Sequence, residues 1–210
     1  MRFSLDTRHP IAVDSPDHLK PLGTKYDNTV NFWFNDNLME MFEYKPSVLD
    51  FGCAGGGMVH SLIKDGCVAV GIEGSDYSLK RKRAEWAVIP DNLFTCDIGY
   101  PFRLSNGSGL PYEFDVITMW EFVEHLPPDR IDAMITNARI HLKNGGYVFG
   151  STNDIRSGGG HHQTLKPMSW WYEQFAKQGF ERAPEIEHHF NMQNAWVRVH
   201  KSNFALRLEK

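Results

Sequence analysis

The 210-residue sequence predicts an α/β fold built on a mostly parallel β-sheet. Two observations carry this prediction. Short apolar runs of strand length alternate with stretches in which apolar residues recur at helical spacing, which is the pattern of parallel strands joined by crossover helices. Three of the apolar runs also lead into glycines or acidic residues, as strands do at the ligand-binding edge of a parallel sheet.

The elements follow from this alternation in chain order. Residues 1–30 are polar and rich in proline and aspartate, so we expect an irregular arm there. Together with a first helix it forms an N-terminal segment, 1–45, ahead of a domain at 46–210. The expected helices are 31–44, 58–64, 77–88, 131–142 and 167–178. The expected strands are 47–51, 68–72, 93–96, 114–120 and 147–149, with a closing antiparallel pair near Ile186 and at 195–200.

Composition excludes several classes of protein. Hydrophobic residues make up 41% and aromatic residues 13% of the chain, which excludes disorder. The 22 basic residues against 26 acidic ones give a net charge of −4, which argues against nucleic acid as a partner. Three cysteines without paired spacing and the lack of a bilayer-length apolar run indicate a cytoplasmic protein that does not enter a membrane.

Three strand ends form the first candidate site. Asp50 lies in a buried strand that leads into the glycine-rich turn at 52–57, and a helix follows. Such a turn lets backbone approach a ligand closely. The next strand ends on Glu73, which can accept hydrogen bonds from both hydroxyls of a ribose, and a third ends on Asp97. Together they predict a crevice for a nucleoside-bearing cofactor.

Here the sequence resembles the class I S-adenosylmethionine-dependent methyltransferases, from about residue 46 to 180. The motifs that carry the resemblance are Val48-Leu49-Asp50-Phe51-Gly52-Cys53-Ala54-Gly55-Gly56, Gly71-Ile72-Glu73, Cys96-Asp97, Phe114-Asp115-Val116-Ile117, Glu124-His125-Leu126 and Leu142-Lys143-Asn144-Gly145-Gly146. One departure is Ala54, which stands where the family usually has its second glycine. The resemblance implies a Rossmann-like, doubly wound, mostly parallel seven-stranded sheet with helices on both faces.

The resemblance also implies S-adenosylmethionine as cofactor and assigns residues to it. Glu73 would hold the ribose hydroxyls, and Asp97 with Ile98 would frame the adenine. Trp120 and Glu121 would lie beside the methyl group. The remaining residues would line the methionine and ribose end: Asp50, Gly52, Ala54 and Gly56.

A hydroxyl acceptor must lose a proton, either to a positioned base or through a metal ion. The expected catalytic residues are Glu121, His125, His161 and His162. A second interpretation is that Glu121, Glu124, His125 and His162 form a divalent metal site, because this combination looks like the metal site of small-RNA 2′-O-methyltransferases. A third is that Glu124 and His125 only cap the following turn, as in family members that use no metal.

The expected reaction is methyl transfer to a hydroxyl or amine of a small acceptor, such as a sugar or a secondary metabolite. Aromatic residues of the arm and of the segment 170–172 are candidates for the pocket roof. The alternatives are a metal-assisted methyltransferase of small RNA ends and a non-catalytic cofactor-binding module. Net charge disfavours the first, and the presence of Asp50, Glu73 and Asp97 disfavours the second. The oligomeric state stays open.

Overall fold

The computed structural model describes residues 1–153, 160–193 and 201–210. Its main sheet has seven strands in the order β4-β3-β2-β6-β7-β9-β8, and a smaller sheet pairs β1 with β5. The strands are β1 (Ser4–Thr7), β2 (Ser47–Phe51), β3 (Val68–Glu73), β4 (Leu93–Thr95), β5 (Phe102–Ser105), β6 (Phe114–Met119), β7 (Leu142–Asn153), β8 (Phe180–Arg182) and β9 (Lys201–Leu208). The helices are α1 (Pro16–Leu19), α2 (Leu22–Tyr26), α3 (Phe32–Met41), α4 (Gly57–Lys64), α5 (Tyr77–Arg81), α6 (Ile131–His141), α7 (Met168–Ala176) and α8 (Pro184–Gln193).

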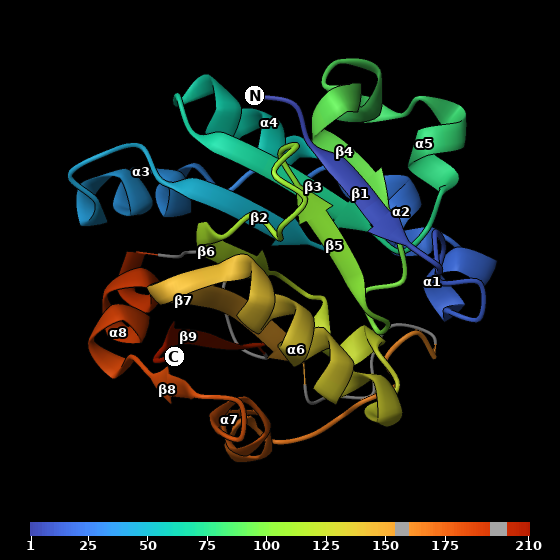
Figure 1. Cartoon of the computed structure of the whole chain (residues 1–210). Coiled ribbons are helices and arrows are strands. Elements are labelled where there is room, and N and C mark those ends of the chain that lie inside the picture. Colours follow the sequence, from blue (N-terminus) through green and yellow to red (C-terminus); the bar gives the residue numbers. More distant parts are fainter. Residues whose placement is uncertain (154–159, 194–200) are drawn as a thin grey trace.

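The expected parallel sheet is confirmed. Strands β4, β3, β2, β6 and β7 pair in parallel, and β9 runs antiparallel to both β7 and β8. Side chains along β2 point alternately to the two faces of the sheet, because Leu49 and Phe51 join one core cluster and Val48 joins the other. Helices α6 and α7 contribute to the first cluster, and α3, α4 and α8 contribute to the second, so helices cover both faces (Figure 1).

The N-terminal arm is more ordered than its composition predicts. Strand β1 pairs antiparallel with β5, and Phe3, just before it, is buried against Phe114 and Tyr112. Two short helices, α1 and α2, then run along the sheet edge where β2 and β3 end (Figure 1). The expectation of an irregular arm is therefore wrong, because pairing with β5 supplies backbone partners that composition does not reveal.

Two further elements differ from expectation. The helix expected over 77–88 ends at Arg81, because Lys82 takes a left-handed backbone (φ 48°), and a 3₁₀ turn at Ala84–Ala87 follows. Buried Trp86 fixes that turn by donating from Nε1 to the carbonyl of Ala54 at 2.8 Å. The antiparallel closing pair is β8 with β9, whereas Ile186 lies in α8. The expected partner segment at 195–200 lies outside the described residues.

None of the helices in the described part is both long and apolar enough to cross a membrane. The cysteines Cys53, Cys67 and Cys96 are buried free thiols, as expected from their spacing.

Candidate active site

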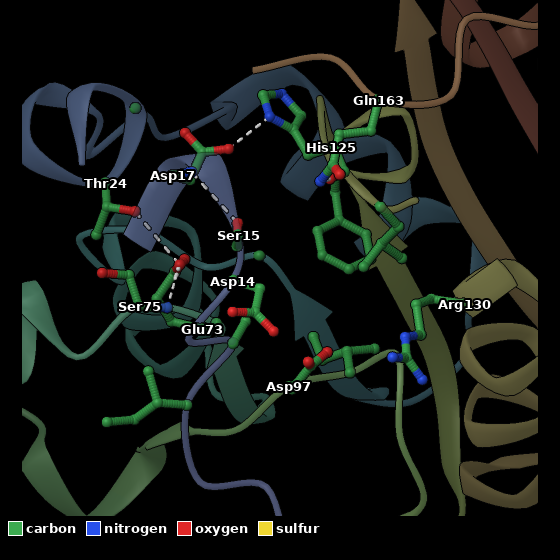
Figure 2. Close-up of a pocket in the computed structure, with 18 of the residues that line it drawn as sticks. Asp14, Ser15, Asp17, Thr24, Glu73, Ser75, Asp97, His125, Arg130 and Gln163 are labelled. Atoms are coloured by element: carbon green, nitrogen blue, oxygen red, sulfur yellow. Dashed lines mark hydrogen bonds and ion pairs between the residues drawn. The ribbon is translucent and has the colours of Figure 1, made fainter. Parts of the chain in front are cut away.

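A cavity of about 350 Å³ opens where β2, β3 and β6 end, beneath the N-terminal arm. This is a volume typical of small-ligand sites. In Figure 2, Asp14, Asp17 and Thr24 of the arm lie on one side of the site, and Glu73, Asp97 and His125, which belong to the sheet and its loops, lie opposite them. Six of the eight expected cofactor residues line it: Gly52, Ala54, Glu73, Asp97, Ile98 and Trp120.

Glu73 is the buried acid at the end of β3. One carboxylate oxygen accepts from the backbone N–H of Ala54 at 2.8 Å, in the glycine-rich turn. The other accepts from the N–H of Ser75 at 3.1 Å and from the hydroxyl of Thr24 at 3.3 Å. Burial raises the pKa of Glu73, and the backbone donors oppose that rise. The carboxylate is thus fixed in orientation and keeps acceptor capacity toward the cavity.

Asp50 and Gly56 support the turn from behind and do not line the cavity in the described structure. Asp50 accepts from the hydroxyl of Thr118 on β6 at 2.6 Å. Burial raises the pKa of Asp50 to about 7. Gly56 has φ 86° at the start of α4, where an added Cβ would lie 2.7 Å from Leu93. Both residues therefore shape the turn, and their direct contact with a cofactor stays a prediction from the sequence.

Asp97 lies at the far side of the cavity, beside a stack of three side chains. The Tyr100 ring is parallel to the His9 ring at 3.7 Å, and the Arg130 guanidinium is 3.9 Å from the same ring centroid. The His9 ring and the Arg130 guanidinium cannot both pack this close to the same face of the Tyr100 ring, so the Tyr100 ring lies between them. Burial raises the pKa of Asp97, with Arg130 and His9 opposing the rise.

Trp120 and Glu121 follow β6 directly. Glu121 has φ 49°, a backbone conformation that costs a non-glycine residue free energy and is concentrated at functional sites. Ser151 of β7 fixes it twice, since its hydroxyl accepts from the N–H of Glu121 at 2.9 Å and donates to its carboxylate at 3.0 Å. The carboxylate of Glu121 is thereby held at the cavity wall.

A second group of polar side chains adjoins Glu121. One potential ligand atom from each of Glu124, His125 and His162 lies within 4.8 Å of the others. Glu124 is fully buried, and its carboxylate oxygens make no hydrogen bond of ordinary geometry in the described structure. Burial raises its pKa to about 7, and Glu121 adds to the rise. His125 lines the cavity and is bonded through Nδ1 to Asp17 of the arm at 2.6 Å.

The segment after Gly160 holds this group in place. The backbone N–H groups of Gln163 and Thr164 both donate to the carbonyl of Glu124, at 2.8 and 3.0 Å. This contact brings His162 to 4.8 Å from His125, ring centre to ring centre, with the rings perpendicular. His161 is buried and is not part of the cavity lining as described. The two adjacent histidines thus occupy different surroundings.

The aromatic roof expected over the pocket is absent from the described lining. Tyr26, Phe32 and Trp33 are exposed on the arm and α3, and Phe34 and Trp171 lie in the core. Short polar stretches of the arm cover the cavity instead, including His9, Asp14, Asp17, Thr24 and Asp27. These residues, with Arg130 and Gln163, are among the lining residues that the sequence did not indicate.

The charge of the lining is strongly one-sided. It contains seven acidic residues and one arginine: Asp14, Asp17, Asp27, Glu73, Asp97, Glu121, Asp129 and Arg130. Low-dielectric walls of one sign focus the electrostatic potential in such a cavity. The site therefore favours a ligand with positive charge.

The sequence pattern of a known family, described as "Methyltransferase domain", matches residues 26–199. The chain belongs to the methyltransferase-domain family. The match covers most of the chain, including the glycine-rich turn at 52–57, Glu73 at the end of β3 and the segment with Glu124 and His125. The class I S-adenosylmethionine-dependent fold expected from the motifs is thus confirmed.

Relatives of this methyltransferase-domain chain are similar over only part of their length. Ubiquinone biosynthesis O-methyltransferase of Thiobacillus denitrificans is 33% identical over 109 residues, which are 50% of this chain and 43% of the relative. The mitochondrial protein of that name from Schizosaccharomyces pombe is 24% identical over 142 residues, 61% of this chain and 51% of the relative. The chain spans about half the length of these curated relatives.

Solved methyltransferases share the fold. An S-adenosylmethionine-dependent methyltransferase from Clostridium acetobutylicum superposes with a TM-score of 0.63 at 11% identity, covering 85% of this chain and 90% of that one. An N1-methyltransferase from Burkholderia thailandensis, solved with 1,6-didemethyltoxoflavin and S-adenosylhomocysteine, gives 0.61 at 14% identity, covering 92% and 84%. At such identities the likeness concerns the fold alone.

Proposed function

We propose that this chain transfers the methyl group of S-adenosylmethionine to a hydroxyl or amine of a small acceptor, such as a sugar or a secondary metabolite. The observation that carries the proposal is a single cavity that joins Glu73 and Asp97 at one end to Glu121 and His125 at the other. When bound, the cofactor supplies an activated methyl group on a sulfonium. The acidic lining fits it, because the cofactor's sulfonium and ammonium outnumber its one carboxylate.

The cofactor end has groups suited to a nucleoside. Glu73 would accept from the ribose hydroxyls, since its carboxylate is fixed by three donors and faces the cavity. Asp97 would accept from the exocyclic amine of the adenine beside Ile98. Gly52 and Ala54 would let the backbone of the turn approach the methionine part closely, with Asp50 and Gly56 holding that turn.

The acceptor end has a candidate base. His125 and Glu121 line the cavity and offer proton acceptors beyond the cofactor end. Burial lowers the pKa of His125, but the contact with Asp17 and the charges of Glu124 and Glu121 outweigh burial and raise that pKa, which strengthens the imidazole as a proton acceptor. The O-methyltransferase names of the relatives support oxygen as the acceptor atom. A catalytic role for buried His161 stays a prediction from the sequence.

Calorimetric titration with S-adenosylhomocysteine tests the cofactor site. We expect micromolar affinity for the wild type and at least a tenfold loss in Glu73→Ala, because a hydrogen bond to a charged group contributes about 1.5–3 kcal/mol. Exposed Glu43→Ala is the matched control and should bind like the wild type. If the wild type takes up neither this compound nor S-adenosylmethionine, the proposal is wrong. A mass-spectrometric screen of sugars, phenols and amines then identifies the acceptor.

One observation favours a metal-assisted form of the same reaction. The carboxyl of Glu124 is buried without an ordinary hydrogen bond and stands next to His125 and His162. Carboxylate and imidazole suit a divalent ion that would orient an acceptor hydroxyl, with Glu121 nearby as a further ligand. Such an ion would not make RNA the acceptor, because the seven acidic residues of the lining would repel phosphates.

Chelation separates the two forms. If a metal is used, a chelator abolishes methyl transfer, added Mn²⁺ or Mg²⁺ restores it, and Glu124→Gln weakens metal binding. Full activity in excess chelator would leave the metal-free form. Glu121→Ala and His125→Ala should lower turnover in both forms.

A further inference from the structure

The N-terminal arm sends one carboxylate to the imidazole at the acceptor end of the cavity. Asp17, in α1, lies 108 positions before His125, yet its Oδ2 is 2.6 Å from Nδ1 of that histidine. Figure 2 shows the two side chains pointing at each other. Both are mostly buried, with 19% and 23% of the side chains exposed, so water competes little for this contact.

This contact decides which nitrogen of His125 faces the acceptor. A neutral imidazole carries its proton on one nitrogen, and a carboxylate at Nδ1 holds the proton there. Nε2 is then left with its lone pair for an acceptor proton or for a metal ion. The backbone of His125 is fixed as well, because the side-chain amide of Gln163 donates from Nε2 to the carbonyl of His125 at 2.6 Å. The other ionisable groups that face this ring are Glu121, Glu124 and His162.

The same arm is hydrogen-bonded at three points to residues at or just after the ends of β3 and β4. The N–H of Ala12 donates to the carbonyl of Gly74 at 2.9 Å, and the N–H of Asp97 donates to the carbonyl of His9 at 2.9 Å. Thr24 donates to Glu73 at 3.3 Å. These contacts place α1 over the cavity, so the position of Asp17 depends on the arm being docked against the ends of β3 and β4.

We propose that Asp17 is a positioning residue for methyl transfer: docked with the arm, it holds His125 through Nδ1 and leaves Nε2 directed to the acceptor. The proposal rests on the proposed function and adds that the arm completes the acceptor end of the site. It applies whether Nε2 takes the proton of the acceptor or binds a metal, because a carboxylate that orients an imidazole serves both uses.

Imidazole NMR of protein labelled with ¹⁵N-histidine tests this without any acceptor. The His125 signals are assigned by their loss in His125→Gln and are recorded at alkaline pH, where the imidazole is neutral. We expect the wild type to show a protonated Nδ1 and an unprotonated Nε2. In Asp17→Ala this tautomer preference is lost, whereas Asp17→Glu restores it at least in part. Asp6→Asn, at an exposed arm carboxylate that pairs with Arg103, leaves the signals unchanged.

Two outcomes overturn the proposal: a wild-type His125 protonated at Nε2, or an Asp17→Ala spectrum with the wild-type His125 tautomer. Titration with S-adenosylhomocysteine separates this result from the fate of the proposed function. We expect Asp17→Ala to bind that compound within about threefold of the wild type, since Asp17 lies at the acceptor end. A wild type that binds no cofactor but shows the Nδ1 tautomer would reject the methyltransferase function and leave the Asp17–His125 pairing intact.

Discussion

Three residues line the cavity with left-handed backbone: Gly52, Ala54 and Glu121, with φ of 79°, 45° and 49°. Two of them carry side chains, so their conformations are strained and persist only because neighbours fix them. Glu73 accepts from the N–H of Ala54, and Ser151 holds Glu121 by two hydrogen bonds. Strain at the wall of the cavity is consistent with a site whose geometry matters more than its stability.

At Gly52 we expect substitution by alanine to damage both stability and binding. A Cβ there would lie 2.7 Å from Cδ2 of Phe122, in addition to the strain of a positive φ. Gly52→Ala should lower the free energy of unfolding by about 2 kcal/mol and weaken S-adenosylhomocysteine binding at least tenfold. Gly107→Ala is the matched control, since Gly107 has φ 94° but nothing within 4 Å. It should cost about 1 kcal/mol and leave binding unchanged. Equal binding losses in both variants would contradict the steric argument.

At the scale of elements, α3 shows how one helix is tied to the site. Phe34 is fully buried and contacts Trp120, Phe149 and Phe190, with ring centres 5.2–5.3 Å away. Trp120 lines the cavity, so the packing of α3 also supports the cavity wall. Phe32, at the start of the same helix, is 67% exposed.

We expect Phe34→Ala to lower the free energy of unfolding by about 3–5 kcal/mol, because it removes a buried aromatic ring and leaves a cavity. Phe32→Ala, an identical change two positions earlier, should change it by no more than about 0.5 kcal/mol. Denaturant unfolding of both variants measures the difference. Similar losses in the two would mean that α3 is not packed as described.

The elements also show what can be predicted from sequence. β2 matches its expected range because a short run of apolar residues is typical of a strand that is buried on both faces of a parallel sheet. Glu73 and Asp97 could be placed together at the cavity because parallel strands end at the same edge of the sheet. The helix at 31–44 was expected, but periodicity alone does not show that Phe34 is buried while Phe32 is exposed. The arm was missed because α1 and α2 are four and five residues long, too short for any periodicity.

One local signal for α1 was present. Ser15-Pro16-Asp17 has a capping residue, a proline at the first helical position and an acid in the first turn, which is the pattern of a helix start. No sequence pattern links Asp17 with His125, since the pair depends on how the arm crosses the sheet edge. Contacts of this kind follow from tertiary packing alone.

At the scale of the whole molecule, two buried titratable groups on different elements act against each other as pH changes. Asp50 of β2 has its pKa raised to about 7 by burial, from an ordinary value of 3.8. His141 of α6 has its pKa lowered by burial to about 4, from 6.5. Its Nδ1 donates to the carbonyl of Asn137 and its Nε2 accepts from the N–H of Leu104, so the folded protein requires the neutral ring.

The two groups have opposite effects between about pH 4 and 6.5. There the unfolded chain has lost the proton of Asp50 while the folded protein keeps it, so this group reduces stability as pH rises. The unfolded chain keeps the proton of His141 while the folded protein lacks it, so this group increases stability as pH rises. The two contributions are opposite in sign, and buried Glu124, whose pKa is also raised to about 7, adds a contribution of the same sign as that of Asp50.

Asp50→Asn removes the carboxyl and keeps an oxygen that can accept from Thr118. Its stability relative to the wild type should therefore increase from pH 4 to pH 7, by up to about 1.4 kcal/mol per pH unit, and stay constant above pH 7. Urea unfolding at about pH 4.5, 5.5, 7 and 8 measures this difference. Asp91→Asn, at an exposed carboxyl, should show no such trend. A pH-independent difference in Asp50→Asn would mean that Asp50 is already ionised in the folded protein near pH 5, and that the glycine-rich turn rests on a charged rather than a neutral carboxyl.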